Sequence, residues 1–165
     1  GVSARLGREN VQFVWLGEGS MLETCRVAAQ RVQGFVDVCF AGHVTDVEPE
    51  YRRATLYLQT SSTENMSLSV IDALRFGVPA IATRVGALPE IVVDQVTGLL
   101  VPAHDVRAAV EAIVQLLQNS EAREGMRNAS RRRYADYFSQ STWYRQLDRV
   151  HGETFDLWTS KGDIA

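Results

Sequence analysis

The feature that most constrains this chain is an alternation of short apolar segments with helical patterns. Five runs rich in Val, Ile, Leu and aromatic residues end in Gly, Ser, Thr or Pro, and most are followed by a helical pattern. They cover residues 11–16, 36–41, 56–60, 80–83 and 99–101. Several are apolar at successive positions, which is typical of strands covered on both faces. This order predicts an α/β fold with a doubly wound parallel sheet.

The helical segments between these runs are residues 21–33, 48–54, 67–76 and 88–93. From about residue 105 the pattern is helical alone. Asp105 is a predicted N-cap for a helix over 106–118, Ser120 for a helix to about 137, and Ser139 or Ser141 for a third. A chain of 165 residues has room for one such domain, spanning 1–165. Because it begins with Gly1, we expect it to be part of a longer protein.

The composition excludes several classes of function. A formal net charge of -3 argues against nucleic-acid binding, which depends on neutralising many phosphates. The two cysteines, Cys25 and Cys39, have no nearby His ligands and make no zinc site. No Asp-x-Asp pair occurs, so we expect no bound metal, and no apolar run approaches the ~20 residues of a membrane-spanning helix.

Ligands of open parallel sheets bind beyond the carboxyl ends of the strands, so the residues just after each strand are candidates. Gly17-Glu18-Gly19 resembles the start of a dinucleotide fingerprint, but Leu22 stands where its third glycine belongs. A tight turn is the simpler interpretation there.

The segment after the third strand carries the strongest signal. Glu64 and Asn65 lead into a helix whose free N–H groups suit a phosphate, and Asp72 lies eight residues beyond Glu64 in the middle of that helix. The alternative is structural, with Asp72 paired to Arg75 on the helix surface and Glu64 solvated in a loop.

The segments around these acids resemble a known family. They are ENMSLSVIDAL (64–74), FGVPAIAT (76–83), GALPEIV (86–92) and TGLLVP (97–102), preceded by GEG (17–19), FAG (40–42) and VEPEY (47–51). Together they resemble group 1 retaining, nucleotide-sugar-dependent glycosyltransferases of the two-domain GT-B architecture. The resemblance covers about residues 11–138 and is to the Rossmann-like C-terminal domain, which binds the sugar donor.

The resemblance implies a role for each matching residue. Glu64 matches the acid that contacts the transferred sugar and acts in catalysis, and Asp72 stands in place of the second acid, which holds the ribose. The other implied donor-binding residues are Asn65, Met66, Ser67, Leu68, Gly17, Gly19 and His43. His43 would border the nucleotide base, although a lone loop histidine is more often a polar surface residue.

Three departures from the family pattern stand out. Asp72 is one methylene shorter than the usual Glu, and Asn65-Met66-Ser67 replaces a Gly-Phe-Gly type segment. The family's first strand, with the Arg and Lys that neutralise the diphosphate, is not found, and Lys161 is the only lysine. We therefore expect the domain's first strand and the acceptor-binding N-terminal domain to lie outside this chain.

The implied function is transfer of a hexosyl unit from a nucleoside diphosphate sugar to a glycan, lipid or other acceptor, with no cofactor. The chain alone is predicted to be inactive, because half of the cleft would be missing. Two alternatives stay open: a degenerate domain that binds without turnover, and a nucleotide-sugar epimerase or sugar phosphorylase of the same architecture. The resemblance implies a cytoplasmic protein and allows peripheral membrane contact in its full-length form.

The segment after Ser139 is unusually aromatic. Its large side chains are Trp143, Tyr144, Phe155, Leu157 and Trp158. Aromatic side chains of this kind either anchor an interface with the partner domain or close the domain's own core.

Overall fold

The computed structural model describes residues 2, 11–31 and 37–161, with side chains described as far as Gly152. In these residues five strands pair only in parallel. They are β1 (Gln12–Leu16), β2 (Asp37–Gly42), β3 (Tyr57–Gln59), β4 (Ala80–Thr83) and β5 (Gly98–Val101). The α/β class with parallel strands in a Rossmann-like arrangement is confirmed.

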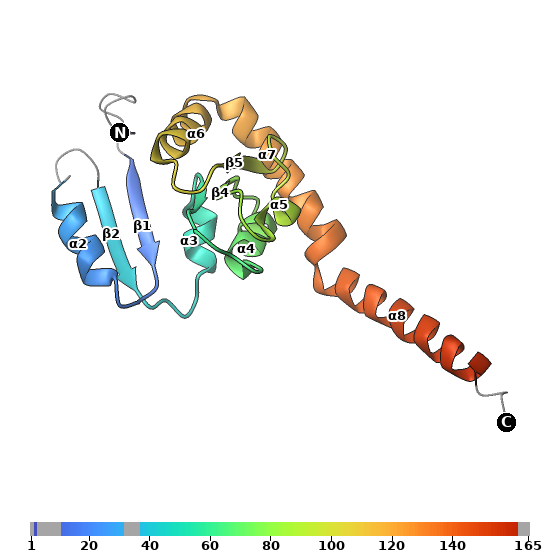
Figure 1. Ribbon diagram of the computed structural model, residues 1–165. Helices are drawn as coiled ribbons and strands as arrows, with labels where there is room; N and C mark the ends of the chain where they lie inside the picture. The colour runs from blue at the N-terminus through green and yellow to red at the C-terminus, as the bar shows by residue number, and fades with distance from the viewer. Residues whose placement is uncertain (1, 3–10, 32–36, 162–165) are drawn as a thin grey trace.

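The strands form two sheets, β1-β2 and β3-β4-β5 (Figure 1). In the part of the chain that the structure describes, β1 pairs with β2 alone and β3 with β4 alone, so each has one open edge. A doubly wound sheet places its first strand between the second and the fourth, which here would be β1 and β3. A first strand outside this chain stays a prediction, and these two edges are where it would pair.

Helices follow or connect the strands in the expected order (Figure 1). They are α2 (Leu22–Gln30), α3 (Glu48–Arg53), α4 (Leu68–Phe76), α5 (Leu88–Ile91), α6 (Val106–Gln118), α7 (Ser120–Arg133), a π-helical turn η1 (Tyr134–Phe138) and α8 (Gln140–Lys161). Residues 32, 33 and 36, which were predicted to belong to α2 and β2, lie outside the described residues, as does the segment 3–10.

The cap predictions had mixed outcomes. The side chain of Asp105 accepts a hydrogen bond from the backbone N–H of Ala108 at 2.9 Å, so it caps α6 as predicted. The prediction for Ser120 was wrong, because Asn119 caps α7 by accepting from the N–H of Ala122 at 2.9 Å. Asn is as strong an N-cap as Ser, and the choice between neighbours is set by where the chain turns. Ser139 accepts from the N–H of Thr142 at 3.3 Å and begins α8.

The core lies on both faces of the second sheet. All residues of its central strand β4 are buried, and their side chains alternate between two apolar clusters. Ile81 faces the cluster that contains Ile113 and Leu116 of α6. Ala80 and Ala82 face the cluster formed with α4 and α5, which includes Leu74. Burial on both faces explains why β4 reads as a continuous apolar run.

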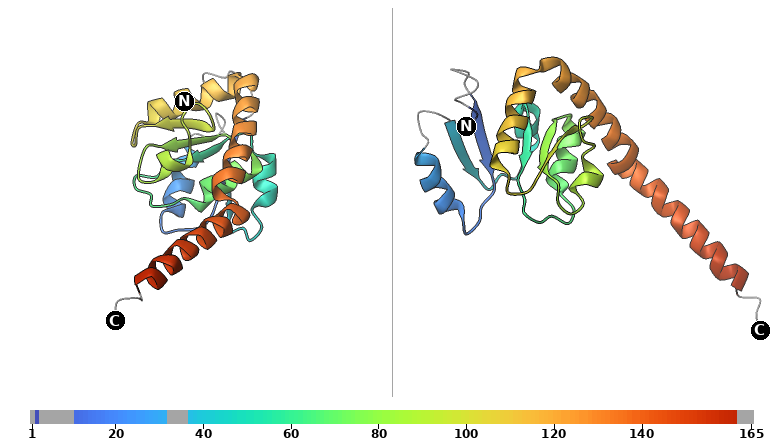
Figure 2. Two further views of the ribbon diagram at one scale, coloured as in Figure 1. Left: turned by 90° about the vertical axis from the view of Figure 1, so that its right-hand side faces the viewer. Right: turned by 45° about the horizontal axis from the view of Figure 1, so that its top comes forward.

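The last helix leaves this core. Figures 1 and 2 show α8 extending away from the sheets beyond η1. Trp143 is 57% exposed, so it does not close the domain's own core. The side chains of Phe155, Leu157 and Trp158 lie outside the described set, and docking of this segment on a partner domain stays a prediction. Among the described residues, no helix combines the length and apolarity needed to cross a membrane.

Packing of α4 against the sheet is testable with two leucines of that helix. Leu74 is fully buried and Leu68 is 71% exposed. We expect Leu74→Ala to lower the free energy of unfolding by about 2–5 kcal/mol, because it leaves a cavity in the core. Leu68→Ala should change it by less than about 0.5 kcal/mol. Urea denaturation measures both values, and equal losses would contradict this assignment of the buried face.

Candidate functional site

The candidate site is built around the segment that joins β3 to α4. Ser67 is buried, and its side-chain oxygen accepts a hydrogen bond from the N–H of Val70 at 3.3 Å, which starts the nine-residue helix α4. A helix N-terminus carries unpaired N–H groups and a partial positive charge. The loop 60–66 therefore ends at a group of backbone donors that favours an anion.

Glu64 is held on one side by residues that precede it. One carboxylate oxygen, Oε2, accepts from Nε2 of Gln59 at 3.0 Å and from the hydroxyl of Ser61 at 3.3 Å. Gln59 also donates to the Ser61 hydroxyl at 2.7 Å. The solvated-loop interpretation of Glu64 does not describe this residue, because its side chain is half-buried and hydrogen-bonded.

The loop after β4 also contacts Glu64, through its backbone. Gly86 has φ +51°, and a Cβ at this position would overlap the backbone carbonyl oxygen of Glu64. Only glycine allows both this backbone conformation and so close an approach. The loops that follow β3 and β4 are therefore in direct backbone contact at the candidate site.

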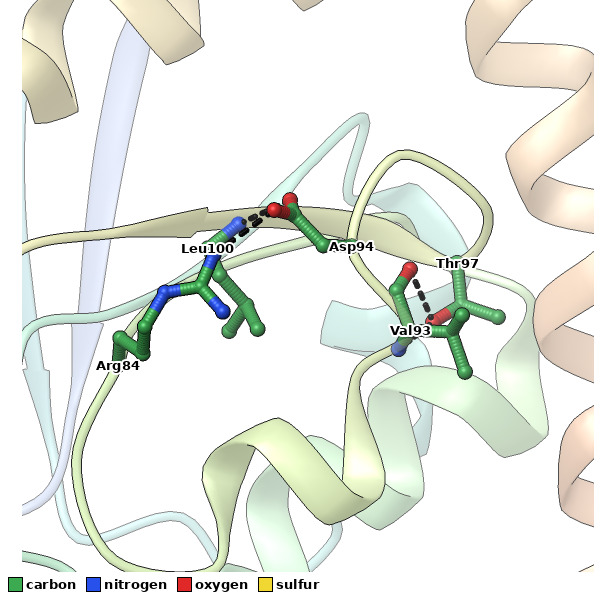
Figure 3. A network of polar contacts seen from close by, with 5 residues as sticks. All are labelled: Arg84, Val93, Asp94, Thr97 and Leu100. Carbon is green, nitrogen blue, oxygen red and sulfur yellow. Dashed lines mark hydrogen bonds and ion pairs between the residues drawn. The ribbon is translucent and has the colours of Figure 1, made fainter.

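A polar network fixes the loop that carries Gly86 (Figure 3). Arg84 forms an ion pair with Asp94 at 2.8 Å, and the other oxygen of Asp94 accepts from the N–H of Leu100 at 2.9 Å. Nearby, the hydroxyl of Thr97 accepts from the N–H of Val93 at 2.9 Å. These bonds join the residues after β4 to strand β5. The guanidinium of Arg84 therefore holds the loop in place through Asp94.

Asp72 lies in the middle of α4 and is half-buried. Among the described ion pairs there is none between Asp72 and Arg75, and the Arg75 guanidinium instead lies 5.1 Å from the ring centre of Phe76. Burial raises the pKa of Tyr57, and the negative charges of Glu64 and Asp72 raise that pKa further. Both carboxylates are therefore near enough to the Tyr57 phenol for their charges to affect it.

Three other predicted residues of this segment follow Glu64 in the sequence. Asn65 is exposed, Met66 is 61% exposed, and Leu68 begins α4 with most of its side chain in solvent. None of these three side chains packs in the core, so each is accessible to a ligand.

Gly17, Gly19 and His43 lie at the carboxyl end of the other sheet. The N–H of Gly17 donates to the carbonyl of Gly42 at 2.7 Å, which joins the ends of β1 and β2, and the exposed His43 follows directly. In the described part of the chain, no hydrogen bond or ion pair links these residues to Glu64 or Asp72. The structure thus brings the predicted site together as two groups, one per sheet.

Sequence reasoning missed Tyr57 and Gln59. The phenol of Tyr57 donates to Oε1 of Gln59 at 2.7 Å, and Gln59 in turn contacts Glu64. The available signal was a glutamine near the end of an otherwise apolar strand, two residues after a tyrosine and therefore on the same face.

The fold and the cluster at its strand ends define an α/β protein of the Rossmann-like class. The chain belongs to the glycosyl transferases group 1 family, whose model matches residues 2–119.

Curated relatives agree with this family. The chain is 35% identical over 105 residues to a D-inositol 3-phosphate glycosyltransferase of Saccharomonospora viridis, an alignment that covers 64% of this chain and 23% of the relative. It is 25% identical over 160 residues to the putative glycosyltransferase EpsD of Bacillus subtilis, covering 94% of this chain and 40% of the relative. The chain thus spans less than half the length of these relatives.

Solved GT-B structures share the fold. Anabaena Alr3699/HepE, solved with UDP, superposes with a TM-score of 0.79 at 16% identity, over 92% of this chain and 44% of that one. The same protein has been solved with UDP-glucose. The C-terminal domain of a group 1 glycosyl transferase (LpcC) of Francisella tularensis superposes with a TM-score of 0.69 at 16% identity, over 79% of this chain and 87% of that one.

The contact between Gly86 and Glu64 predicts the effect of one methyl group. We expect Gly86→Ala to destabilise the protein by roughly 1–3 kcal/mol, because the Cβ displaces the Glu64 backbone and strains φ. Gly152→Ala is the matched control, since a Cβ there meets nothing within 4 Å. Urea denaturation compares the two variants, and a Gly86→Ala protein as stable as the control would contradict the observed contact.

Proposed function

We propose that this chain is the donor-binding part of a retaining glycosyltransferase that moves a hexosyl unit from a nucleoside diphosphate sugar to an acceptor. The observation that carries the proposal is the position of Glu64. Its carboxylate is held at the carboxyl end of β3, three residues before the N-cap of α4, and its charge raises the pKa of Tyr57, as does the charge of Asp72. This arrangement offers an acid for the sugar next to backbone donors for the phosphates.

The start of α4 supports the phosphate part of the proposal. Backbone N–H groups and the helix dipole stabilise negative charge, and they do so most at the oxygen where charge develops as the leaving group departs. The described cation at the end of β4, Arg84, is already paired with Asp94. The helix N-terminus is therefore the main positive feature that these loops contribute to a diphosphate.

Asp72 is proposed to hold the ribose hydroxyls. A carboxylate only accepts hydrogen bonds, and the two ribose hydroxyls are donors. The side chain is shorter than the Glu of the family pattern, so the contact needs a closer ribose or a bridging water.

The comparisons support this assignment without fixing the substrates. UDP and UDP-glucose are ligands of the similar Anabaena protein, and the similar Saccharomonospora protein is named a glycosyltransferase. We propose transfer as the activity of the full-length protein together with an acceptor-binding domain, and donor binding alone as the property of this chain. A cytoplasmic location with peripheral membrane contact belongs to the same proposal.

Two substitutions separate the proposed roles of the acids. Glu64→Gln should weaken binding of a nucleotide sugar about tenfold or more and leave the bare nucleotide unaffected, because Glu64 contacts only the sugar. Asp72→Asn should weaken both ligands by similar factors, because both contain the ribose. Calorimetric titration with UDP-glucose, GDP-mannose, UDP and GDP measures these changes.

Glu121→Gln serves as the control, since it removes an exposed carboxylate from the first turn of α7. It should bind all four ligands as the unchanged protein does. If none of the nucleotide sugars binds the unchanged protein, or if Glu64→Gln has no effect, the proposed function is wrong.

A further inference from the structure

Tyr57, Gln59 and Ser61 form a chain of hydrogen bonds that ends on Glu64. Tyr57 and Gln59 belong to β3 and lie two residues apart, on one face of the strand. The phenol donates to Oε1 of Gln59 at 2.7 Å, and Nε2 of Gln59 donates to Glu64 at 3.0 Å and to Ser61 at 2.7 Å.

Glu64 determines which groups donate and which accept in this series of hydrogen bonds. A carboxylate only accepts hydrogen bonds, so the amide of Gln59 must turn its NH₂ group toward Glu64 and its oxygen toward Tyr57. The opposite orientation would place two acceptors against each other. The phenol of Tyr57 can fill the donor role because its ordinary pKa lies well above neutral pH, and burial raises that pKa further, as do the charges of Glu64 and Asp72. Its hydroxyl therefore keeps its proton at neutral pH.

Ser61 is fixed independently of Glu64. Its carbonyl oxygen accepts from the hydroxyl of Thr83 at 2.7 Å, and Thr83 is the buried last residue of β4. The Ser61 hydroxyl then reaches Oε2 of Glu64 at 3.3 Å. Two donors, one from β3 and one from a loop tied to β4, thus converge on the same carboxylate oxygen.

The other oxygen of Glu64, Oε1, takes no part in these hydrogen bonds among the described residues. Anchoring one oxygen with two donors restricts the rotation of the carboxylate, and a restricted group loses less entropy when a ligand binds.

We propose that Tyr57, Gln59 and Ser61 are positioning residues that direct Oε1 of Glu64 toward the transferred sugar. This inference rests on the proposed function, in which Glu64 contacts that sugar, and adds which residues determine the orientation of the contact. These residues touch Glu64 or one another, so they act on the sugar through Glu64.

The test measures the part of donor affinity that depends on the sugar. The full-length protein is titrated with UDP-glucose and UDP, and with GDP-mannose and GDP, and the pair that binds is used. The ratio of the two dissociation constants isolates the contribution of the sugar. Gln59→Met keeps the length of the side chain and removes its donors. It should weaken binding of the nucleotide sugar about tenfold relative to the bare nucleotide, whose own affinity should change by no more than about twofold.

Two further variants sharpen the result. Tyr57→Phe frees the Gln59 amide to turn and should change the ratio in the same direction by about threefold. Tyr51→Phe is the matched control. The Tyr51 hydroxyl donates to the Ser69 carbonyl at 2.8 Å and takes no part in the hydrogen bonds that link Tyr57 to Glu64, so the ratio should stay unchanged. Tyr57→Phe also provides the test if Gln59→Met does not fold.

A double-mutant cycle distinguishes positioning from a general structural role. In a Glu64→Gln background, Gln59→Met should have little further effect on the ratio, because the carboxylate that it positions is gone. Equal weakening of nucleotide and nucleotide sugar by Gln59→Met, or additive effects in the cycle, would overturn the inference and leave the proposed function intact. Failure of every nucleotide sugar to bind the unchanged protein would instead overturn the proposed function and this inference with it.

Discussion

The backbone contact between Gly86 and Glu64 is the constraint on which the candidate site depends. Glycine at position 86 allows the loops after β3 and β4 to touch, because a side chain there would overlap the Glu64 carbonyl. The β4 loop is in turn held to β5 by the Arg84–Asp94 ion pair, and β4 itself is buried on both faces. The backbone position of Glu64 is therefore set by a loop that is tied to the buried strand β4, and the hydrogen bonds of Gln59 and Ser61 hold its carboxylate.

Much of this arrangement could be predicted from the sequence. The continuous apolar run of β4 and the acids after β3 indicated a parallel sheet with a site at its strand ends, because burial and strand direction leave direct marks in the sequence. The bonds of Gln59 were not predictable, because they depend on side-chain rotamers and on how the β3 loop folds back. The cap of α7 at Asn119 was missed for a different reason: Asn and Ser are equally good caps, and the sequence does not show where the chain turns.

The division of the strands into two sheets has a consequence for function. Glu64 and Asp72 belong to the β3-β4-β5 side, whereas Gly17, Gly19 and His43 belong to the β1-β2 side. A nucleotide sugar that used all of them would have to extend across the open edges of β1 and β3. The β3 side carries both acids and the start of α4.

The most direct test of the account is to locate the ligand on the protein. Amide NMR spectra recorded during titration with UDP-glucose, and with GDP-mannose in parallel, report which backbone groups sense the ligand. The account predicts that the largest shifts fall on residues 61–68 and on the loop 84–87. Shifts concentrated elsewhere, for example on the pocket at α2 lined by Glu23, Val27 and Arg31, would contradict it.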